Sequence, residues 1–382
     1  MKKLVFVLAP DSFKGSLTAK EVCAAMERGI KKVLPSSECI SVPMADGGEG
    51  TVHSLVDTTK GDIHEEEVTG PLGRPVKAFY GIMGDGKTAV IEMASASGLH
   101  LVDETTKNPL ITTTYGTGQL VKSCLDRGVQ KIIIGIGGSA TNDGGAGFAQ
   151  ALGVKLKDKE GNELPFGGGA LSHLQYVDVS GIDYRLKDVQ IEIASDVSNP
   201  LCGENGATYV FGPQKGTTPE IVDILDKALC HYATILKEQL NKDVIDTPGA
   251  GAAGGLGAGL LAFTNARIQR GVDIIIKHTN LHKKIKKADI VITGEGGIDY
   301  QTKFGKTPYG VAQLAKAENK KVIAIAGYIG KDVEMLYDIF DAIFGILPGV
   351  MTMPEAINTA TKNIERTTEN IVRLLLINPD TH

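Results

Sequence analysis

The sequence lacks the residues and spacings from which several kinds of site are built. Its 382 residues include no tryptophan, and its five cysteines are scattered without a Cys-x-x-Cys pair. An odd number of dispersed cysteines is typical of reduced thiols and argues against a disulfide framework or a cysteine zinc site. The eight histidines show no His-x-x-His spacing, and no Gly-x-Ser-x-Gly motif is present. Zinc hydrolases and α/β-hydrolases are therefore not indicated.

Long apolar runs and long basic runs are also missing. No segment approaches the ~18 consecutive apolar residues of a membrane span. The apolar run Leu4 to Ala9, which follows two lysines, is too short for the core of a signal peptide. The net charge is −5, so neither nucleic acid nor an anionic membrane is expected as a partner. We expect a cytoplasmic protein that acts on small molecules, and a homo-oligomer is compatible with this composition.

Glycine, by contrast, is abundant at 47 residues, and it is densest in the segment Lys131 to Gly147, KIIIGIGGSATNDGGAG. The three isoleucines predict a strand that is buried on both faces. The glycines and hydroxyl residues after it leave backbone N–H groups unobstructed, as a phosphate-binding loop requires. The predicted phosphate ligands are Gly137, Gly138, Ser139, Thr141 and Asn142, and Asp143 is a candidate metal ligand.

The order of strand-like and helix-like segments predicts two α/β domains, one inserted into the other. Apolar runs near both ends of the chain alternate with helical segments, as in a doubly wound parallel sheet with a flavodoxin-like number of strands. The middle of the chain begins instead with three short strands joined by tight turns, an antiparallel meander. We predict a discontinuous doubly wound domain, residues 1–60 and 286–382, an inserted mixed-sheet α/β domain, residues 61–285, and a ligand cleft between them. The strands expected in the outer domain are 4–9, 39–42, 289–293, 321–326 and 342–347, and those in the inserted domain include 65–68, 76–81, 88–93, 132–134, 189–194 and 209–211.

Two nucleotide-binding motifs occur as patterns, and neither fits its context well. Gly81 to Thr88 matches the P-loop pattern GxxxxGK[ST], but a strand-like segment follows where a P-loop needs a helix, and Asp85-Gly86 predicts a hairpin turn. Gly135 to Ala140 fits the dinucleotide fingerprint, with Asp158 placed as a ribose-binding carboxylate would be. The two glycines and the carboxylate in Thr141 to Gly145 weaken that second interpretation. A nicotinamide-dependent enzyme remains an alternative.

Charged and hydroxyl side chains follow several of the predicted strands. Phosphoryl transfer needs phosphate-binding amides, a cation, Mg²⁺ and often a carboxylate that accepts the hydroxyl proton. Lys14 is the best placed cation, and Asp196 and Asp46 are the candidates for the base, so these three are the predicted catalytic residues. The predicted substrate-binding residues lie in the same kind of loop and are Ser12, Glu295, Asp299 and Lys306.

Six blocks of sequence occur together along the chain. They are APDSFKGSL (9–17), ADGGEGT (45–51), GIGGSATNDGGAG (135–147), ASDVSNPLCG (194–203), FGPQKG (211–216) and GEGGID with GKTPYGVA (294–312). In this order the blocks resemble those of the bacterial type I glycerate kinases, over essentially the whole length. The resemblance implies transfer of the ATP γ-phosphoryl group to glycerate with Mg²⁺, and a two-domain α/β fold with the active site in the cleft. One departure is Gly297, where the family commonly has arginine, and Lys303 or Lys306 could replace the lost contact.

The predicted function is therefore the ATP-dependent phosphorylation of glycerate at the 2- or 3-hydroxyl, with 2-phosphoglycerate slightly favoured as the product. ATP and Mg²⁺ are the expected cofactors. The first alternative is an NAD(P)-dependent oxidoreductase acting on a small hydroxy acid. The second is a non-catalytic protein that binds sugar acids, although carboxylates at several strand ends would repel an acid in the absence of a metal ion or other cations.

Overall fold

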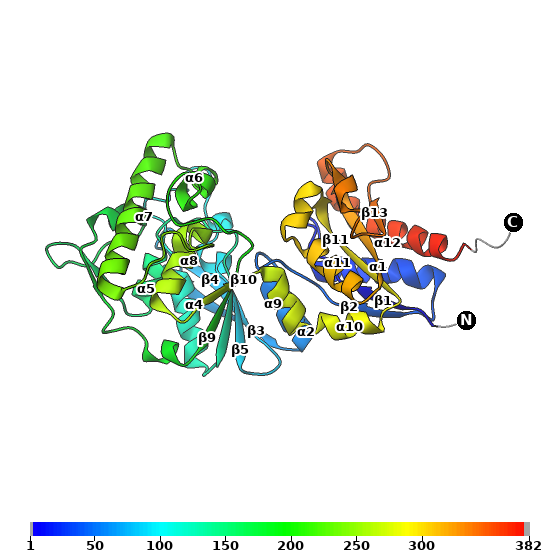
Figure 1. Ribbon diagram of the computed structural model, residues 1–382, viewed down its shortest axis with the longest axis horizontal. Coiled ribbons are helices and arrows are strands. Elements are labelled where there is room, and N and C mark those ends of the chain that lie inside the picture. The colour runs from blue at the N-terminus through cyan, green and yellow to red at the C-terminus, as the bar shows by residue number, and fades with distance from the viewer. Residues whose placement is uncertain (1–2, 378–382) are drawn as a thin grey trace. The chain divides into compact units, whose positions relative to one another are not determined.

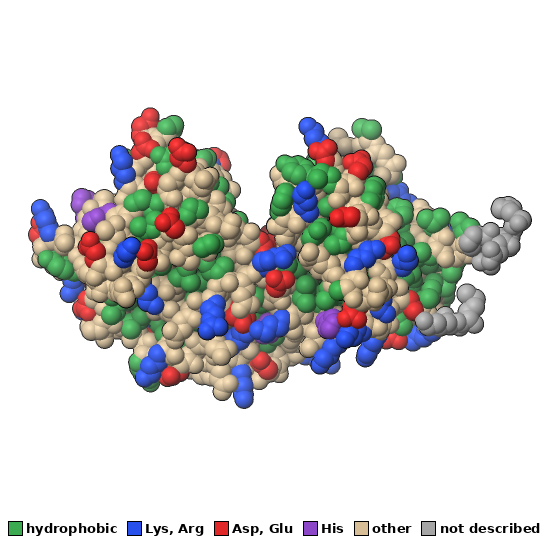
Figure 2. All heavy atoms as spheres, viewed as in Figure 1, with side chains coloured by type: hydrophobic (Ala, Val, Ile, Leu, Met, Phe, Trp, Pro, Cys, Tyr) green, Lys and Arg blue, Asp and Glu red, His purple; other side chains and the backbone are tan. Residues whose placement is uncertain are grey.

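The computed structural model describes residues 3–377, which form two compact units (Figure 1). The first, here called the split unit, comprises residues 3–46 and 272–377, and the second, the inserted unit, comprises Gly47–Gly271. Acidic and basic side chains are interspersed on the visible face of each unit (Figure 2). Within the described residues no helix is long and apolar enough to cross a membrane, and the five cysteines are free.

The split unit is built on a five-stranded parallel sheet in the order β13-β12-β11-β1-β2. Counted along this unit alone, the order is 2-1-3-4-5, which is that of a flavodoxin-like doubly wound sheet. The predicted fold of the outer domain is thereby confirmed, and the topological switch point lies between β1 and β11. The strands are β1 (Val5–Leu8), β2 (Glu38–Ser41), β11 (Ile290–Ile298), β12 (Lys321–Ile329) and β13 (Ala342–Gly345).

Helices α1 and α12 pack side by side in the split unit because a glycine lets them approach. A Cβ atom on Gly29 of α1 would lie 2.4 Å from the carbonyl oxygen of Glu365 in α12. The Glu365 carboxylate also accepts from Arg28 at 2.9 Å. Each helix begins at a threonine capping box. The helices are α1 (Ala19–Val33), α9 (Gly271–His278), α10 (Leu281–Lys287), α11 (Thr307–Ala317) and α12 (Met353–Leu375), with 3₁₀ turns η5 (Tyr300–Phe304) and η6 (Val333–Leu336).

The inserted unit contains a six-stranded mixed sheet in the order β10-β9-β6-β5-β4-β3. Strands β3, β4 and β5 pair antiparallel, which confirms the predicted meander, whereas β5, β6, β9 and β10 are parallel. The strands are β3 (Asp62–Thr69), β4 (Pro75–Ile82), β5 (Thr88–Glu92), β6 (Lys131–Gly135), β9 (Gln190–Ala194) and β10 (Arg267–Gln269), and a separate pair is formed by β7 (Lys155–Lys157) and β8 (Tyr176–Asp178).

Helices surround this sheet, and one of them replaces a predicted strand. Residues 209–211 belong to α6, which turns back after the loop that follows β9 and has no strand partner, so the β preference of Tyr-Val-Phe is overridden. The helices are α2 (Thr51–Thr59), α3 (Ala94–Ser97), α4 (Tyr115–Asp126), α5 (Ala146–Ala151), α6 (Ala207–Phe211), α7 (Pro219–Leu240) and α8 (Ala252–Phe263). The 3₁₀ turns are η1 (Leu99–Leu101), η2 (Gly168–His173), η3 (Tyr184–Lys187) and η4 (Pro213–Lys215).

The chain passes from one unit to the other after Asp46 and again after Gly271, whereas the predicted boundaries followed residues 60 and 285. Helix α2 belongs to the inserted unit because it packs on the meander, where a Cβ on Gly81 would lie 2.3 Å from Val56. Helix α9, from Val272 on, belongs to the split unit because the same kind of close approach occurs between Val272 and Gly310 of α11. The packing of these two helices sets the boundaries, rather than the point at which strands and helices stop alternating along the sequence.

The segment that matches the P-loop pattern is the β4–β5 hairpin, as expected. The Asp85 carboxylate accepts from the backbone N–H groups of Lys87 and Thr88 at 2.8 and 2.9 Å. Gly86 supplies the left-handed conformation at φ +65° that the turn needs. The turn is therefore closed by its own side chain and leads into a strand, which is not the geometry of a phosphate-binding P-loop.

Candidate active site

Five charged side chains gather in the split unit around the switch point of its sheet. They form what we call the acid–lysine cluster, and they are Asp11, Lys14, Asp46, Glu295 and Lys306. The backbone N–H of Asp11, just after β1, donates to the carbonyl of Gly294 in β11 at 2.8 Å, which ties the two strand ends together. Ligands of open α/β sheets bind outside the carboxyl ends of the strands at this point. The cluster therefore occupies the position at which a doubly wound sheet usually carries its site.

Asp11 lies at the centre of this cluster and was not among the predicted site residues. Its side chain is 5% exposed and accepts from the Ser12 N–H at 2.6 Å and from the Thr307 hydroxyl at 2.7 Å. Burial, together with the nearby Asp46 carboxylate, raises the pKa of Asp11 to about 6. Its position just after the first buried strand is a signal that the sequence offers, although the predicted site residues were its neighbours Ser12 and Lys14.

Glu295 provides a second carboxyl group in the cluster, with 15% of its side chain exposed. Its Oε1 accepts from the Thr302 hydroxyl at 3.2 Å and lies 3.6 Å from the Lys306 ammonium. Burial raises the pKa of Glu295 to about 7, although Lys306 opposes this shift. The predicted residue Asp299 has a local role, because its carboxylate caps the η5 turn by accepting from the Gln301 N–H at 2.9 Å.

Lys14 and Asp46, two of the predicted catalytic residues, form an ion pair at a distance of 3.6 Å. The Lys14 side chain is 66% exposed, so its ammonium remains accessible to a ligand from solvent. The Asp46 carboxylate is the main cause that raises the pKa of Lys14. The cluster thus combines an accessible cation with carboxyl groups that titrate close to neutral pH.

The glycine-rich loop after β6 lies in the inserted unit and has an exposed half and a buried half. Gly137 and Gly138 are exposed, whereas residues 139–147 are buried. Thr141 and Asn142 are completely buried, and the Asn142 amide donates to the Thr208 hydroxyl at 2.9 Å. Of the predicted phosphate ligands, only Gly137 and Gly138 therefore present backbone to solvent, and Ser139 is 6% exposed beside them.

Asp143 acts as an internal anchor of this loop. Its carboxylate is fully buried and accepts from the N–H and the hydroxyl of Thr114, each at 2.8 Å. It also accepts from the N–H groups of Gly145 and Gly147 at 3.1 and 3.2 Å. Four internal donors occupy its oxygens, so the donor set does not fit the predicted role of Asp143 as a metal ligand.

Three loops meet at the carboxyl ends of β6 and β9 in the inserted unit. A Cβ on Gly135 would lie 2.3 Å from the carbonyl oxygen of Gly47, and a Cβ on Gly47 would lie 2.8 Å from the Cβ of Ala194. Asp196, in the third loop, is exposed and accepts from the Gly271 N–H at 3.0 Å. Asp196 thus belongs to the inserted unit, whereas Asp46 and Lys14 belong to the split unit.

Two other predictions about the site can be placed. Asp158 accepts from the Glu160 and Asn162 N–H groups within the turn after β7. Strand β7 pairs with β8 in a separate sheet, so Asp158 does not end a strand that neighbours β6, as a ribose-binding carboxylate should. At Gly297, a Cβ would lie 2.9 Å from the ring of Tyr328 on the neighbouring strand β12. The tyrosine ring fills the space into which a larger side chain at residue 297 would project.

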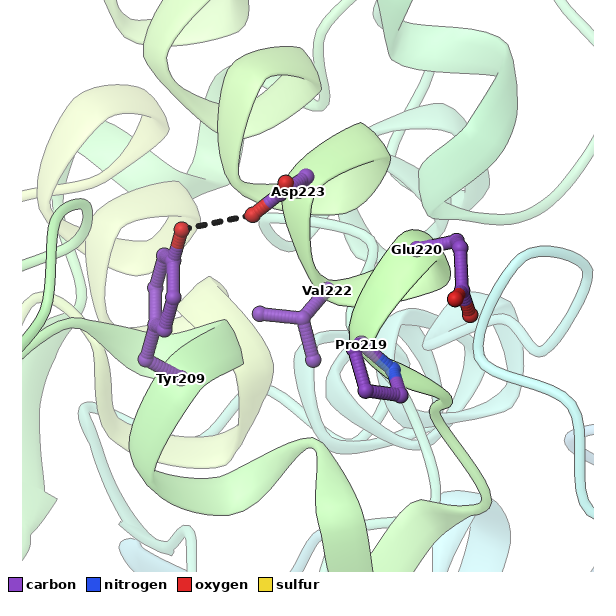
Figure 3. Close-up of a pocket in the computed structure, with 5 residues that line it drawn as sticks. All are labelled: Tyr209, Pro219, Glu220, Val222 and Asp223. Atoms are coloured by element: carbon purple, nitrogen blue, oxygen red, sulfur yellow. Dashed lines mark hydrogen bonds between the residues drawn. The ribbon is translucent and has the colours of Figure 1, made fainter.

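A pocket of about 380 Å³ lies elsewhere in the inserted unit, between α6 and the start of α7 (Figure 3). The Tyr209 hydroxyl donates to Asp223 at 2.7 Å across it. None of the predicted site residues lines this pocket. Among residues 3–377, no group of three histidine, cysteine, aspartate or glutamate side chains is arranged to hold a metal ion.

Fold and site together define a two-unit α/β protein with charged groups gathered at the switch point of a doubly wound sheet. Comparison with known proteins gives the family. The family model for the glycerate kinase family matches residues 6–376. Glycerate kinase of Bacillus subtilis is 54% identical over 96% of both chains. Glycerate 2-kinase of Escherichia coli is 51% identical over 97% of this chain and 98% of its own. A crystal structure of a candidate glycerate kinase 2 from Salmonella typhimurium LT2 superimposes with a TM-score of 0.89 at 49% identity, covering 98% of each chain. The chain belongs to the glycerate kinase family.

Proposed function

We propose that this chain transfers the γ-phosphoryl group of ATP to the 2-hydroxyl group of glycerate. Glycerate kinase activity is that of its family, and the choice of the 2-hydroxyl rests on one observation. The Escherichia coli relative named glycerate 2-kinase is 51% identical over 97% of this chain. Such identity over nearly the full length supports the same acceptor group in both proteins.

The acid–lysine cluster supports a division of roles in the split unit. The substrate is an anion, and Lys14 and Lys306 are the cations near the buried carboxyl groups. Lys306 is also the residue that precedes α11, whose first N–H groups add positive potential. We assign Lys306, with Ser12, to the substrate and Lys14 to the transferred phosphoryl group. Asp299 holds the η5 turn beside them through its cap.

The carboxyl groups supply the base. Asp11 and Asp46 lie close enough for Asp46 to raise the pKa of Asp11, and a carboxyl group poised near neutral pH suits proton transfer from a hydroxyl group. We assign Asp11 or Asp46 to this role, and Asp196 remains the candidate from the inserted unit. Mg²⁺ is commonly held by one or two carboxylates, water and substrate phosphates, and the Asp11–Asp46 pair fits that requirement. When bound, the ion would neutralise charge on the phosphates.

The exposed half of the glycine-rich loop supports binding of the ATP phosphates. Gly137 and Gly138 offer backbone N–H groups without a side chain in front of them, and the Ser139 hydroxyl lies next in the chain. Thr141 and Asn142 are buried and would act from beneath, by holding the loop in shape. The predicted contact of these two residues with phosphate therefore becomes an indirect role.

The test is an assay of ATP consumption with D-glycerate and L-glycerate, followed by ³¹P NMR of the product. We expect 2-phosphoglycerate, because the relative named above is a 2-kinase. Formation of 3-phosphoglycerate would refute the choice of hydroxyl, and binding of glycerate without ATP consumption would refute the kinase activity. A parallel assay of nicotinamide absorbance tests the oxidoreductase alternative, for which we expect no change.

A variant of Asp11 tests the site itself. Asp11→Asn removes the carboxylate but keeps an acceptor for the Thr307 hydroxyl, so the fold should survive while kcat falls by a factor of about 10² or more. Asp85→Asn, in the β4–β5 turn, is the matched control and should retain its kcat. An Asp11→Asn variant with nearly unchanged kcat would remove Asp11 from the chemistry.

A further inference from the structure

A buried lysine in the inserted unit has no part in the roles assigned above. Lys215 ends the η4 turn and is 1% exposed, one of the largest completely buried side chains of the described residues. Lysine is almost never fully buried unless its ammonium is paired. Its Nζ donates to the carbonyl oxygen of Thr141 at 2.7 Å. The contact therefore joins η4 to the buried half of the glycine-rich loop.

The surroundings of Lys215 are polar and belong to the same loop. The Asp143 carboxylate lies near enough to oppose the effect of burial, which lowers the pKa of Lys215 to about 7. The Thr141 hydroxyl and the side-chain Oδ1 of Asn142 in the same loop are buried without a hydrogen-bond partner among the described residues. The loop thus brings one carboxylate, that of Asp143, and one carbonyl oxygen, that of Thr141, to the Lys215 ammonium.

Local sequence explains how a lysine reaches this position. Pro213 starts the η4 turn, and Gly216 follows it in a left-handed conformation at φ +94°. A Cβ on Gly216 would lie 2.8 Å from the side chain of Lys107, which packs over the turn. Only glycine satisfies both the conformation and the close approach. The FGPQKG block therefore turns the chain and directs the Lys215 side chain into the interior of the unit.

We propose that Lys215 is a positioning residue for ATP, which acts by holding the Thr141 carbonyl and so fixes the exposed end of the glycine-rich loop. The inference rests on the proposed function, because it takes Gly137 and Gly138 as the phosphate-binding groups. Lys215 touches the loop from within the unit and does not contact the substrate.

The other fixed points of the loop show where this contact acts. The exposed half is tied to η1 and α3, because Leu99 N–H donates to the Gly138 carbonyl at 2.8 Å and Ala140 N–H donates to Ser97 at 3.0 Å. The far end is held by the four donors on Asp143. Thr141 lies between these two anchors, and Lys215 supplies the hydrogen bond to its carbonyl. Loss of that bond leaves the Thr141 carbonyl without its donor, in the segment that links the exposed half to the core.

The main experiment replaces Lys215 by methionine, which has a similar length but neither charge nor donor. We expect the KM for ATP and the Kd for ATP by calorimetry to rise at least tenfold, with the KM for glycerate within twofold of wild type. Lys107→Met is the matched control, since Lys107 packs on the same turn but pairs with Glu104. Both of its KM values should stay within twofold of wild type.

A purely structural role would give a different pattern. Partial unfolding lowers the fraction of active protein, and therefore kcat, without a selective change in the KM for ATP. That pattern, or an unchanged affinity for ATP in a folded Lys215→Met variant, would overturn the inference. A wild-type protein that does not phosphorylate glycerate would instead refute the proposed function, whatever the variant does.

A second variant covers the case in which Lys215→Met does not fold. Lys215→Ala is purified and assayed with and without propylammonium chloride, whose ammonium can take the place of the missing group. We expect propylammonium to lower the KM or Kd for ATP at least threefold, and tetramethylammonium, which cannot donate, to have no effect. Absence of any recovery with propylammonium would count against the role of Lys215.

Discussion

Glu295 should make the stability of the protein depend on pH in a direction opposite to that of most carboxylates. Its side chain is 15% exposed, and burial raises its pKa from 4.5 to about 7 in the folded state, with Lys306, Asp11 and Asp46 as its charged neighbours. Between these two pH values the folded protein retains a proton that the unfolded chain has lost. The contribution to stability is therefore complete below pH 4.5 and is lost as the pH rises to about 7.

The size of the effect follows from the difference between the two pKa values. At about 1.4 kcal/mol per pH unit, it amounts to about 3 kcal/mol. Glu295→Gln removes this titration. The free energy of unfolding of the variant, relative to wild type, should therefore increase by about 3 kcal/mol between pH 4.5 and pH 8.

The assay is urea unfolding followed by circular dichroism at 222 nm, for both proteins at pH 4.5, 6 and 8. The two units can unfold in separate transitions, so the transition of the split unit is the one to compare. Glu21→Gln is a control of opposite sign, because hydrogen bonds from Thr18 lower the pKa of Glu21. Wild type and Glu295→Gln with parallel pH profiles would refute the reasoning.

Three further predictions concern stability and can be checked by thermal unfolding. Gly86→Ala should cost about 1 kcal/mol, because φ is +65° there and no atom lies within 4 Å of the added Cβ. Gly254→Ala should cost well over twice as much, because φ is similar at +67° and the added Cβ would lie 1.9 Å from the Thr141 carbonyl oxygen. Equal losses of stability would show that the space around Gly254 is not filled. Asp143→Ala leaves four buried donors without an acceptor and should destabilise the inserted unit by at least about 3 kcal/mol, so a nearly unchanged melting temperature would contradict its role as an anchor. Thr352→Ala breaks the capping box of α12 and should cost about 1 kcal/mol, and no loss would mean that the cap is dispensable.

The sequence predicted the secondary structure best where one local rule acts alone. Helix α7 begins at Pro219 after the cap Thr218 and ends at Leu240, and both its start signal and its apolar periodicity can be read in the sequence. The parallel strands were found because strands buried on both faces are continuous apolar runs. Residues 209–211 were wrongly predicted as a strand. These three β-favouring residues have no partner strand and form part of helix α6 instead.

The site could be predicted only in part, since pairing depends on the order of strands in the sheet. The proximity of Lys14 and Asp46 followed from two loops at neighbouring strand ends. The burial of Asp11 did not, because it depends on Thr307, a residue almost 300 positions further along the chain. The burial of Lys215 was not predicted for the same reason. A lysine in a polar, glycine-containing segment is expected in solvent, and only the fold directs its side chain inward.

The glycine-rich loop shows most clearly where sequence and structure diverge, because its glycines meet two different physical demands. Gly137 and Gly138 are exposed, so the absence of a side chain leaves their amides open to a ligand. Gly144 and Gly145 are buried at φ +63° and +77°, and a Cβ on either would lie within 3.0 Å of Tyr232 or Gly259. A pattern of residues cannot distinguish glycines kept for access from glycines kept for close packing. In sequence the loop therefore resembles one long phosphate-binding segment. In the structure only its first part is exposed to a ligand, and the buried remainder determines how firmly that part is held.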